Sequence, residues 1–373
     1  MPFHARAGAT RTEVRPLLRA AARPRPPPPP VPAETPVKFA RPVLAATALL
    51  AATACGGNAE AGPATAPAAG SATVQLRLPD PGNAGVLAVA KKDGSLDRAL
   101  AAVHAKVAWA EAPAGFAEAA DALNSGRLDA AQGSISTGLL PLAGKPGFEL
   151  FGAAQPDPIG EGILVKNNSG IKSVKDLAGR KVAVDAGGTG EYLLLQALAK
   201  YKVPAEQVQR VRLSPEQARS QFGIGEVDAW AAAGEPVVTE LAHASAYLVT
   251  SGFGAGSDNY RVWAVRSELA RQHPEVVRAL YDYLREVDGR AQRDPAAYLN
   301  VFTSSGPEAV SGRAKDVRVD VGRAAAPLGP IQEADAVRLE KVAQLFAAQH
   351  VTPSVVDVRS HLLDVNSLAG SAR

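Results

Sequence analysis

From residue 74 onward, short apolar runs alternate with segments in which apolar residues recur every three or four positions. Phe116, Ala119, Ala120 and Leu123 have this helical spacing. Strands separated by amphipathic helices are typical of α/β proteins with mostly parallel sheets. A first series of strands is predicted at 74–78, 106–112, from 129 onward, 148–153 and 162–165, with helices from residue 83, at 116–124 and after 133–137.

A second series of strands and helices begins after residue 165. Ser214, Pro215 and Gln217 provide an N-cap, a proline at the first helical position and a capping-box glutamine, which predicts that a helix starts there. Strands are predicted at 181–185, 208–213, 227–232 and 246–250, a strand returning to the first series at 261–265, and helices at 173–178, 191–201, 274–287, 295–302 and 334–350.

The front of the chain has the pattern of an export signal. An apolar run at 42–54 follows Lys38 and Arg41, and its 13 residues are too few to span a bilayer, which needs about 20. Small residues then precede Cys55, which resembles the bacterial lipobox and implies lipid attachment to Cys55. An ordinary signal peptide followed by an unmodified cysteine is the alternative.

The residues on either side of this signal have a different composition. Residues 1–36 include an Arg-rich stretch and five consecutive prolines at 26–30, a prefix that favours a mis-assigned start and a true translation start near Val37. Residues 55–71 start at Cys55 and continue with small residues, proline and glycine, a composition that predicts a flexible tether.

The positive net charge of the chain belongs to its front end. Residues 1–54 contain eight basic and two acidic residues, which leaves 32 basic and 35 acidic residues for the remainder. A nucleic-acid-binding role therefore gains no support from the charge.

Cysteine and histidine usage limits the chemistry. A single cysteine excludes an intramolecular disulfide framework and a thiolate metal cluster. The six histidines lack metal-ligand spacing such as HExxH. We therefore expect no metal and no cysteine–histidine catalysis.

Several segments together resemble one family, the solute-binding proteins of ABC importers for aliphatic sulfonates, taurine and nitrate. The resemblance covers about residues 73–365. It is carried by IKSVKDLAGRKVAV (171–184), GGTGEYLLLQAL (187–198), ALNSGRLDAA (122–131), LAGKP (142–146), GEVDAW (225–230), RQHPEVVRAL (271–280) and VDVRSHL (356–362).

The resemblance implies an α/β fold of the type II periplasmic-binding-protein kind. Each lobe is expected to be a mixed, mostly parallel sheet flanked by helices, with the ligand cleft between the lobes. Residues 72–162 and 255–373 would form lobe one, and residues 163–254 lobe two. The implied protein is an exported, lipid-anchored, non-catalytic binding protein without a cofactor, whose partners are a small anionic or zwitterionic solute, an inner-membrane permease and its ATPase.

Three turns that open helices are the candidate ligand contacts, because helix N-termini present unpaired N–H groups and partial positive charge to an anion. Capping or a tight turn alone is the alternative for each. The first turn contains Gly82 and Asn83, the second Ser134, Ser136 and Thr137, and the third Gly188, Thr189 and Gly190.

Three acidic residues near the expected cleft point to a zwitterion. The resemblance implies that a carboxylate matching Glu161 is common in relatives, that Glu191 stands where sulfonate binders often have histidine, and that Glu235 follows a glycine in place of an aromatic residue. A carboxylate there would pair with an ammonium group. A solvated surface charge is the alternative for each glutamate.

Other functions remain open on this pattern. Nitrate and thiamine-pyrimidine precursors are alternative solutes, and a pyrimidine-synthase-like enzyme is an alternative activity on the same fold. Such an enzyme needs a Schiff-base lysine and a cleft histidine, and the expected cleft loops contain neither. A sensory or adhesive lipoprotein is a third possibility.

Overall fold

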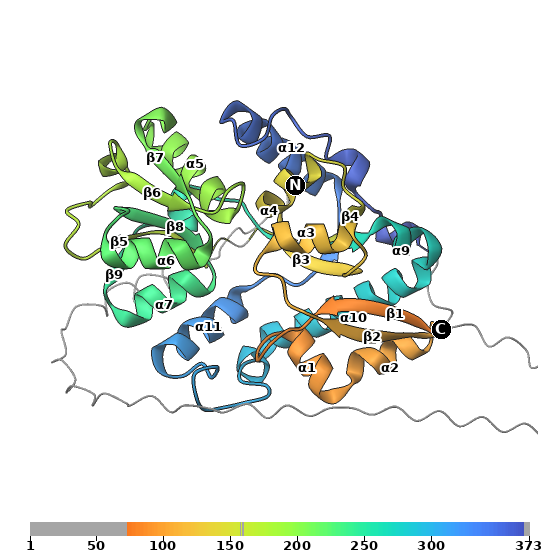
Figure 1. Ribbon diagram of the computed structural model, residues 1–373. Coiled ribbons are helices and arrows are strands. Elements are labelled where there is room, and N and C mark those ends of the chain that lie inside the picture. The colour runs from red at the N-terminus through yellow and green to blue at the C-terminus, as the bar shows by residue number, and fades with distance from the viewer. Residues whose placement is uncertain (1–72, 157, 159, 369–373) are drawn as a thin grey trace, which may run out of the picture. The chain divides into compact units, whose positions relative to one another are not determined.

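Two main groups of strands organise the protein, whose computed structural model describes residues 73–156, 158 and 160–368. We call the part built on strands β1–β4, β10 and β11 lobe one and the part built on β5–β9 lobe two (Figure 1). The export signal, the tether and Cys55 lie outside the described residues.

Lobe one contains a four-stranded sheet in the order β11-β4-β10-β3 and a parallel pair, β1-β2. The strand β10 pairs antiparallel with both β3 and β4, so the predicted return of the chain to the first series is confirmed. The strands are β1 (Val74–Pro79), β2 (Ala105–Ala110), β3 (Ala130–Ser134), β4 (Phe148–Ala153), β10 (Arg261–Arg266) and β11 (Gly329–Pro330).

The helices of lobe one come from both ends of the described chain. They are α1 (Val86–Asp93), α2 (Ser95–Ala101), α3 (Phe116–Asn124), α4 (Ile135–Leu142), α9 (Ser267–Gln272), α10 (Pro274–Arg293), α11 (Gly312–Ala324) and α12 (Glu333–Ala348), with 3-10 turns η3 (Pro295–Tyr298), η4 (Arg359–His361) and η5 (Val365–Ser367).

Lobe two is a five-stranded mixed sheet in the order β7-β6-β8-β5-β9. Its β6 pairs parallel with β7 and β8, whereas β5 pairs antiparallel with β8 and β9. Its elements are β5 (Glu161–Lys166), η1 (Val174–Leu177), β6 (Lys181–Val184), α5 (Thr189–Tyr201), η2 (Ala205–Gln207), β7 (Gln209–Arg212), α6 (Pro215–Ile224), β8 (Ala229–Ala233), α7 (Glu235–His243) and β9 (Ala246–Ser251), after which α8 (Gly252–Ala255) leads back to lobe one.

Local sequence explains where several of these helices start. At α6, Ser214 Oγ accepts from the Gln217 N–H, and Gln217 Oε1 accepts from the Ser214 N–H, which confirms the predicted capping box. Helix α3 matches its predicted bounds, and the four residues whose spacing predicted it, Phe116, Ala119, Ala120 and Leu123, are all buried.

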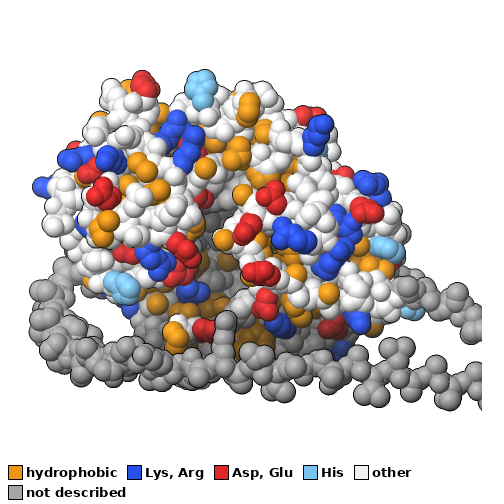
Figure 2. All heavy atoms as spheres, in the orientation of Figure 1, with side chains coloured by type: hydrophobic (Ala, Val, Ile, Leu, Met, Phe, Trp, Pro, Cys, Tyr) orange, Lys and Arg blue, Asp and Glu red, His pale blue; other side chains and the backbone are white. Residues whose placement is uncertain are grey.

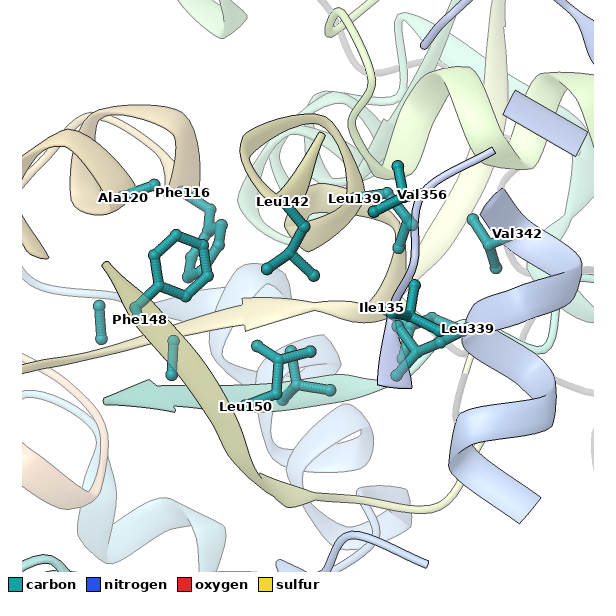
Figure 3. Close-up of a cluster of buried hydrophobic side chains, with 14 of the residues drawn as sticks. Phe116, Ala120, Ile135, Leu139, Leu142, Phe148, Leu150, Leu339, Val342 and Val356 are labelled. Carbon is teal, nitrogen blue, oxygen red and sulfur yellow. The ribbon is translucent and has the colours of Figure 1, made fainter. Parts of the chain in front are cut away.

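One hydrophobic core of lobe one is formed by the helices α3, α4 and α12, which pack together with the strand β4 (Figure 3). The rings of Phe116 and Phe148 meet edge to face at 5.9 Å. Ile135, Leu139 and Leu142 from α4 point into the same cluster as Leu339 and Val342 from α12. This packing fixes the start of α4, where three candidate ligand contacts lie.

The structure also departs from the predicted elements. The helix expected from Asn83 begins at Val86, because Gly85 has a φ of 94° and is followed by the first helical residue. The helix expected at 295–302 is only the short turn η3. Strand β5 starts at Glu161, inside the segment that was expected to belong to lobe one.

The sheets contain more antiparallel pairs than the alternation of strands and helices suggests. Strands β5 and β10, the first strands after each crossing between the lobes, run antiparallel to their neighbours. No helix in the described ranges is long and apolar enough to cross a membrane.

Candidate functional site

Hydroxyl groups from the two lobes meet at the start of α5. Thr189 Oγ1 of lobe two lies 3.2 Å from Ser134 Oγ and 3.3 Å from Ser136 Oγ of lobe one. Asn259 Nδ2 also donates to Thr189 Oγ1, at 3.2 Å. The second and third predicted turns are therefore brought together.

The start of α4 is held by a capping box. Ser134 Oγ accepts from the Thr137 N–H, and Thr137 Oγ1 accepts from the Ser134 N–H. Ser134 and Thr137 thus have the capping role that was the alternative to ligand contact, and both also line cavities. Ser136 is fully buried and bonds Asn259 as well as Thr189.

Glu161 lies in the same polar cluster. Its carboxylate is 5% exposed and accepts from Ser257 Oγ at 2.7 Å and from Asn259 Nδ2 at 2.8 Å. Because Asn259 bonds Glu161, Ser136 and Thr189, one amide joins the crossing segment to both lobes. Glu161 is thus a buried, hydrogen-bonded group and not a solvated surface charge.

Three cavities surround the first turn of α5. The Glu161 cavity, of about 370 Å³, is lined by Ser134, Thr189, Asn259 and Arg261 among others. The Trp230 cavity, of about 170 Å³, is lined by Asp185 and Thr189. The Arg212 cavity, of about 410 Å³, contains Thr137, Asp185, Gly188 and Arg212 in its wall. Figure 2 shows the surface hollowed between the lobes, with acidic side chains near the edge of the hollow.

Neighbouring atoms approach the loop before α5 so closely that two of its positions require glycine. A Cβ on Gly188 would lie 1.6 Å from Asp185 Oδ2, and a Cβ on Gly190 would lie 2.1 Å from the Ala231 carbonyl oxygen. Gly187 has a φ of 62°, a conformation that side chains disfavour. The loop therefore needs glycine whether or not a ligand approaches it.

Asp185 occupies the start of α5 with its own carboxylate. It follows β6 directly, and its Oδ1 accepts from the Gly190 N–H at 2.8 Å. Burial, opposed by the main-chain hydrogen bonds and reinforced by the charge of Glu191, raises the pKa of Asp185. Asp185 is not among the ligand contacts predicted from the sequence, although a carboxylate at the end of a strand and before a glycine-rich turn is a signal for one.

Glu191 points away from the three cavities. It is fully buried, accepts from the Gly187 N–H at 2.8 Å, and forms ion pairs with Arg210 at 3.0 Å and Arg212 at 3.1 Å. The alternative of a solvated surface charge is therefore wrong for Glu191. Its carboxylate therefore links the loop before α5 to β7 and neutralises part of the charge of two guanidinium groups.

Glu235 forms an exposed pair on α7. It accepts from Arg219 at 2.5 Å and from Thr239 Oγ1, and its side chain is about half exposed. Burial opposes ionisation, but the hydrogen bonds from Thr239 and Arg219 outweigh it and lower the pKa of Glu235. The preceding Gly234 lines the Glu161 cavity.

Asn83 is engaged by a distant loop. Its Nδ2 donates to the carbonyl oxygens of Thr303 and Glu308, and its Oδ1 accepts from the N–H groups of Phe302 and Thr303. Asn83 is also not an N-cap, since α1 begins three residues later. Together with Gly82 it lines a separate surface cavity that shares no residue with the three around α5.

The charged groups near the site do not suggest a metal centre. Within the described ranges, no group of three or more His, Cys, Asp or Glu side chains is placed to hold a metal ion. Arg261, which lines the Glu161 cavity, is paired with Asp288 at 2.8 Å.

Comparison with protein families gives one match. The model for the family described as NMT1/THI5 like matches residues 152–296, which include β5–β9, the second crossing segment and the whole of α10.

Two relatives from Escherichia coli strain K12 show the extent of similarity. A protein named as an aliphatic sulfonates-binding protein is 29% identical over 299 residues, which is 76% of this chain and 90% of that protein. A taurine-binding periplasmic protein is 32% identical over 137 residues, which is 35% of this chain and 41% of that protein.

Solved structures share the fold over most of the chain. The alkanesulfonate-binding protein of Xanthomonas axonopodis pv. citri bound to MOPS is 25% identical with a TM-score of 0.69, covering 79% of this chain and 99% of that one. A desulfurization enzyme, DSZB, is 20% identical with a TM-score of 0.52, covering 79% of this chain and 98% of that one, and shows the fold alone.

Proposed function

We propose that this chain is the solute-binding component of an ABC importer and captures a small organosulfonate between its lobes, since the NMT1/THI5-like family model matches residues 152–296 and the sulfonate-binding relatives match most of the chain. The observation that carries the proposal is the meeting of Thr189 with Ser134 and Ser136 beside three cavities. A ligand favours closure only through contacts with both lobes, and these residues supply donors from both.

The donors at this position suit a sulfonate. Three sulfonate oxygens share one negative charge, so they accept several neutral hydrogen bonds at once. Hydroxyls of Ser134, Thr137 and Thr189 and the Asn259 amide line the cavities. Closing around the ligand would exchange the present hydroxyl contacts for contacts to its oxygens.

The cellular setting is inferred from the names of the relatives. Relatives named as periplasmic or sulfonate-binding proteins support an extracytoplasmic location and delivery of the solute to an inner-membrane permease and its ATPase. We propose further that Cys55 bears a lipid that holds the protein at the outer face of the membrane, since small residues precede it at the end of an apolar run.

Binding without catalysis fits the cavity walls better than an enzyme does. A fold neighbour is a desulfurization enzyme, so the fold accommodates catalysis. Among the described residues that line the three cavities, however, there is no lysine or histidine. A pyrimidine-synthase-like reaction would need both.

Isothermal titration calorimetry of the purified protein tests the proposal. Saturable heat is expected with 2-aminoethanesulfonate or a simple alkanesulfonate, and the affinity should fall with Thr189→Val. Thr239→Val, on α7, is the matched control, because Thr239 lines none of the three cavities. Saturable binding of nitrate or an aminopyrimidine, with no heat from any sulfonate, would replace the proposed solute.

A further inference from the structure

Asp185 and Arg212 place one negative and one positive side chain in the wall of the same interlobe cavity. The Arg212 cavity, of about 410 Å³, is also lined by Phe116 and Leu140 of lobe one. No other charged residue lines this cavity among the described residues. Its wall is therefore complementary to a molecule that carries both charges.

The carboxylate of Asp185 already fills the start of α5. Its Oδ1 accepts the Gly190 N–H at 2.8 Å, and its Oδ2 lies where a Cβ of Gly188 would be. A ligand oxyanion cannot use the same N–H group and would meet a like charge there. The anionic end of a ligand must consequently lie elsewhere in the cavity.

No Lys or Arg of the described chain forms an ion pair with Asp185. The nearest guanidinium in the cavity wall, Arg212, donates twice to Glu191 Oε1, at 3.1 and 3.3 Å. Arg210 binds the same carboxylate oxygen. Asp185 thus accepts main-chain N–H groups and has no cationic partner among the described residues, so a ligand ammonium in this cavity would supply the opposite charge.

Arg212 remains accessible from the cavity. Its side chain is 46% exposed although it bonds the buried Glu191. A guanidinium has five N–H donors, so those not directed at Glu191 can bind sulfonate oxygens. The cavity wall adds the hydroxyls of Thr137 and Ser214.

We infer that Asp185 is the specificity-determining residue of this cleft and that it selects a zwitterionic aminoalkanesulfonate, with the ammonium at Asp185. Asp185 lines the Arg212 cavity together with Thr137 and the Trp230 cavity together with Thr189, so donors for the sulfonate lie on both sides of it. The inference rests on the proposed function and narrows its solute class. It also reassigns the ammonium-binding carboxylate, because Glu191 and Glu235 are paired with arginines.

Two probes of nearly equal shape test this selection. Propane-1-sulfonate has a methyl group where 2-aminoethanesulfonate has an ammonium. Calorimetry on the wild-type protein is expected to give about ten-fold tighter binding of 2-aminoethanesulfonate, the size of one charge-assisted hydrogen bond. Equal or tighter binding of propane-1-sulfonate would overturn the inference while leaving sulfonate capture intact. Failure of both probes to bind would overturn the proposed function and the inference with it.

A pair of variants assigns the preference to one side chain. Asp185→Asn keeps an acceptor for the Gly190 N–H but removes the charge, and should reduce the preference to about two-fold or less. Asp228→Asn, also in lobe two and also bonded to a main-chain N–H, lines none of the three cavities and should leave the preference unchanged. A full preference in Asp185→Asn would contradict the assignment.

Discussion

Single residues at the start of α5 are constrained by atoms that lie close to them. Gly188 and Gly190 leave room for Asp185 and for the backbone of β8, so their identity is explained by packing. Asp185, in turn, is a half-buried carboxylate without an ion-pair partner, which is the kind of group that proteins retain at binding sites at the expense of stability.

A methyl group added at Gly190 should unfold part of lobe two. Gly190→Ala places Cβ 2.1 Å from the Ala231 carbonyl oxygen, which is backbone and cannot turn aside, so a loss of about 3 kcal/mol is expected. Gly223→Ala, in α6, meets open space and should be neutral or stabilise by up to about 1 kcal/mol. Urea denaturation of both variants measures the difference, and equal stability would contradict the close approach.

The stability of an Asp185→Asn variant should depend on pH in a defined direction. The folded pKa of Asp185 is raised, so the folded state holds its proton more tightly than the unfolded state. Stability from this group is therefore present below the unfolded pKa, about 3.9, and is lost as pH rises through the folded pKa. The variant should melt at a higher temperature than wild type at pH 7.5, and this advantage should disappear near pH 3.5. An advantage that grows on acidification would show that the pKa is lowered.

At the scale of elements, local signals located most helices and strands but did not identify the helix α11. This helix has no buried residue, so its sequence lacks the apolar stripe that makes a helix recognisable. It nevertheless packs on α10 and η3 of lobe one and on α7 of lobe two (Figure 1). Val321 of α11 lines the Glu161 cavity, so the helix contributes to the site more than to the core.

Displacing α11 should weaken ligand binding more than it weakens folding. In Gly322→Leu the new Cβ would lie 2.8 Å from Pro295 Cβ, which forces α11 away from η3. Because α11 buries no side chain, we expect less than about 1 kcal/mol of lost stability and a several-fold loss of affinity. Lys315→Leu, at an exposed position of the same helix, is the control. Thermal unfolding and calorimetry on both variants separate the two effects, and an unchanged affinity in Gly322→Leu would contradict the role.

At the scale of the whole described chain, the two lobes are joined by contacts at the end of α12 as well as by the hydroxyls around Thr189. Tyr192 of α5 packs edge to face on Phe346 of α12 at 6.2 Å, and Arg210 donates to the Gln349 carbonyl oxygen. Closure is therefore supported partly by the protein itself and partly by its ligand.

Removing the Thr189 hydroxyl should favour an open form without ligand. Thr189→Val loses its contacts with Ser134, Ser136 and Asn259, each worth about 1 kcal/mol. Small-angle scattering of the ligand-free protein should give a larger radius of gyration for Thr189→Val than for wild type. Thr239→Val should not change it. An identical radius for Thr189→Val and wild type would indicate that the hydroxyl contacts do not hold the lobes together.

Attachment to the membrane should depend on Cys55. Wild-type protein expressed in a bacterium is expected to incorporate labelled fatty acid and to sediment with membranes, whereas Cys55→Ser should do neither, because the thiol is the attachment point. Ser71→Ala, at the other end of the expected tether, is the control. Labelling of Cys55→Ser would place the lipid elsewhere, and an unlabelled wild type would indicate an ordinary signal peptide.

The sequence by itself determined the order of most strands and helices and the two turns that open α4 and α5, because periodicity and capping depend on residues that are close along the chain. Tertiary structure decided which side chains face the cavities. Glu191 forms ion pairs with Arg210 and Arg212. Asn83 is hydrogen-bonded to a loop more than 200 residues away, whereas Asp185 lines a cavity. The partners of a charged side chain come from segments that only folding brings together, so they cannot be predicted from local sequence patterns.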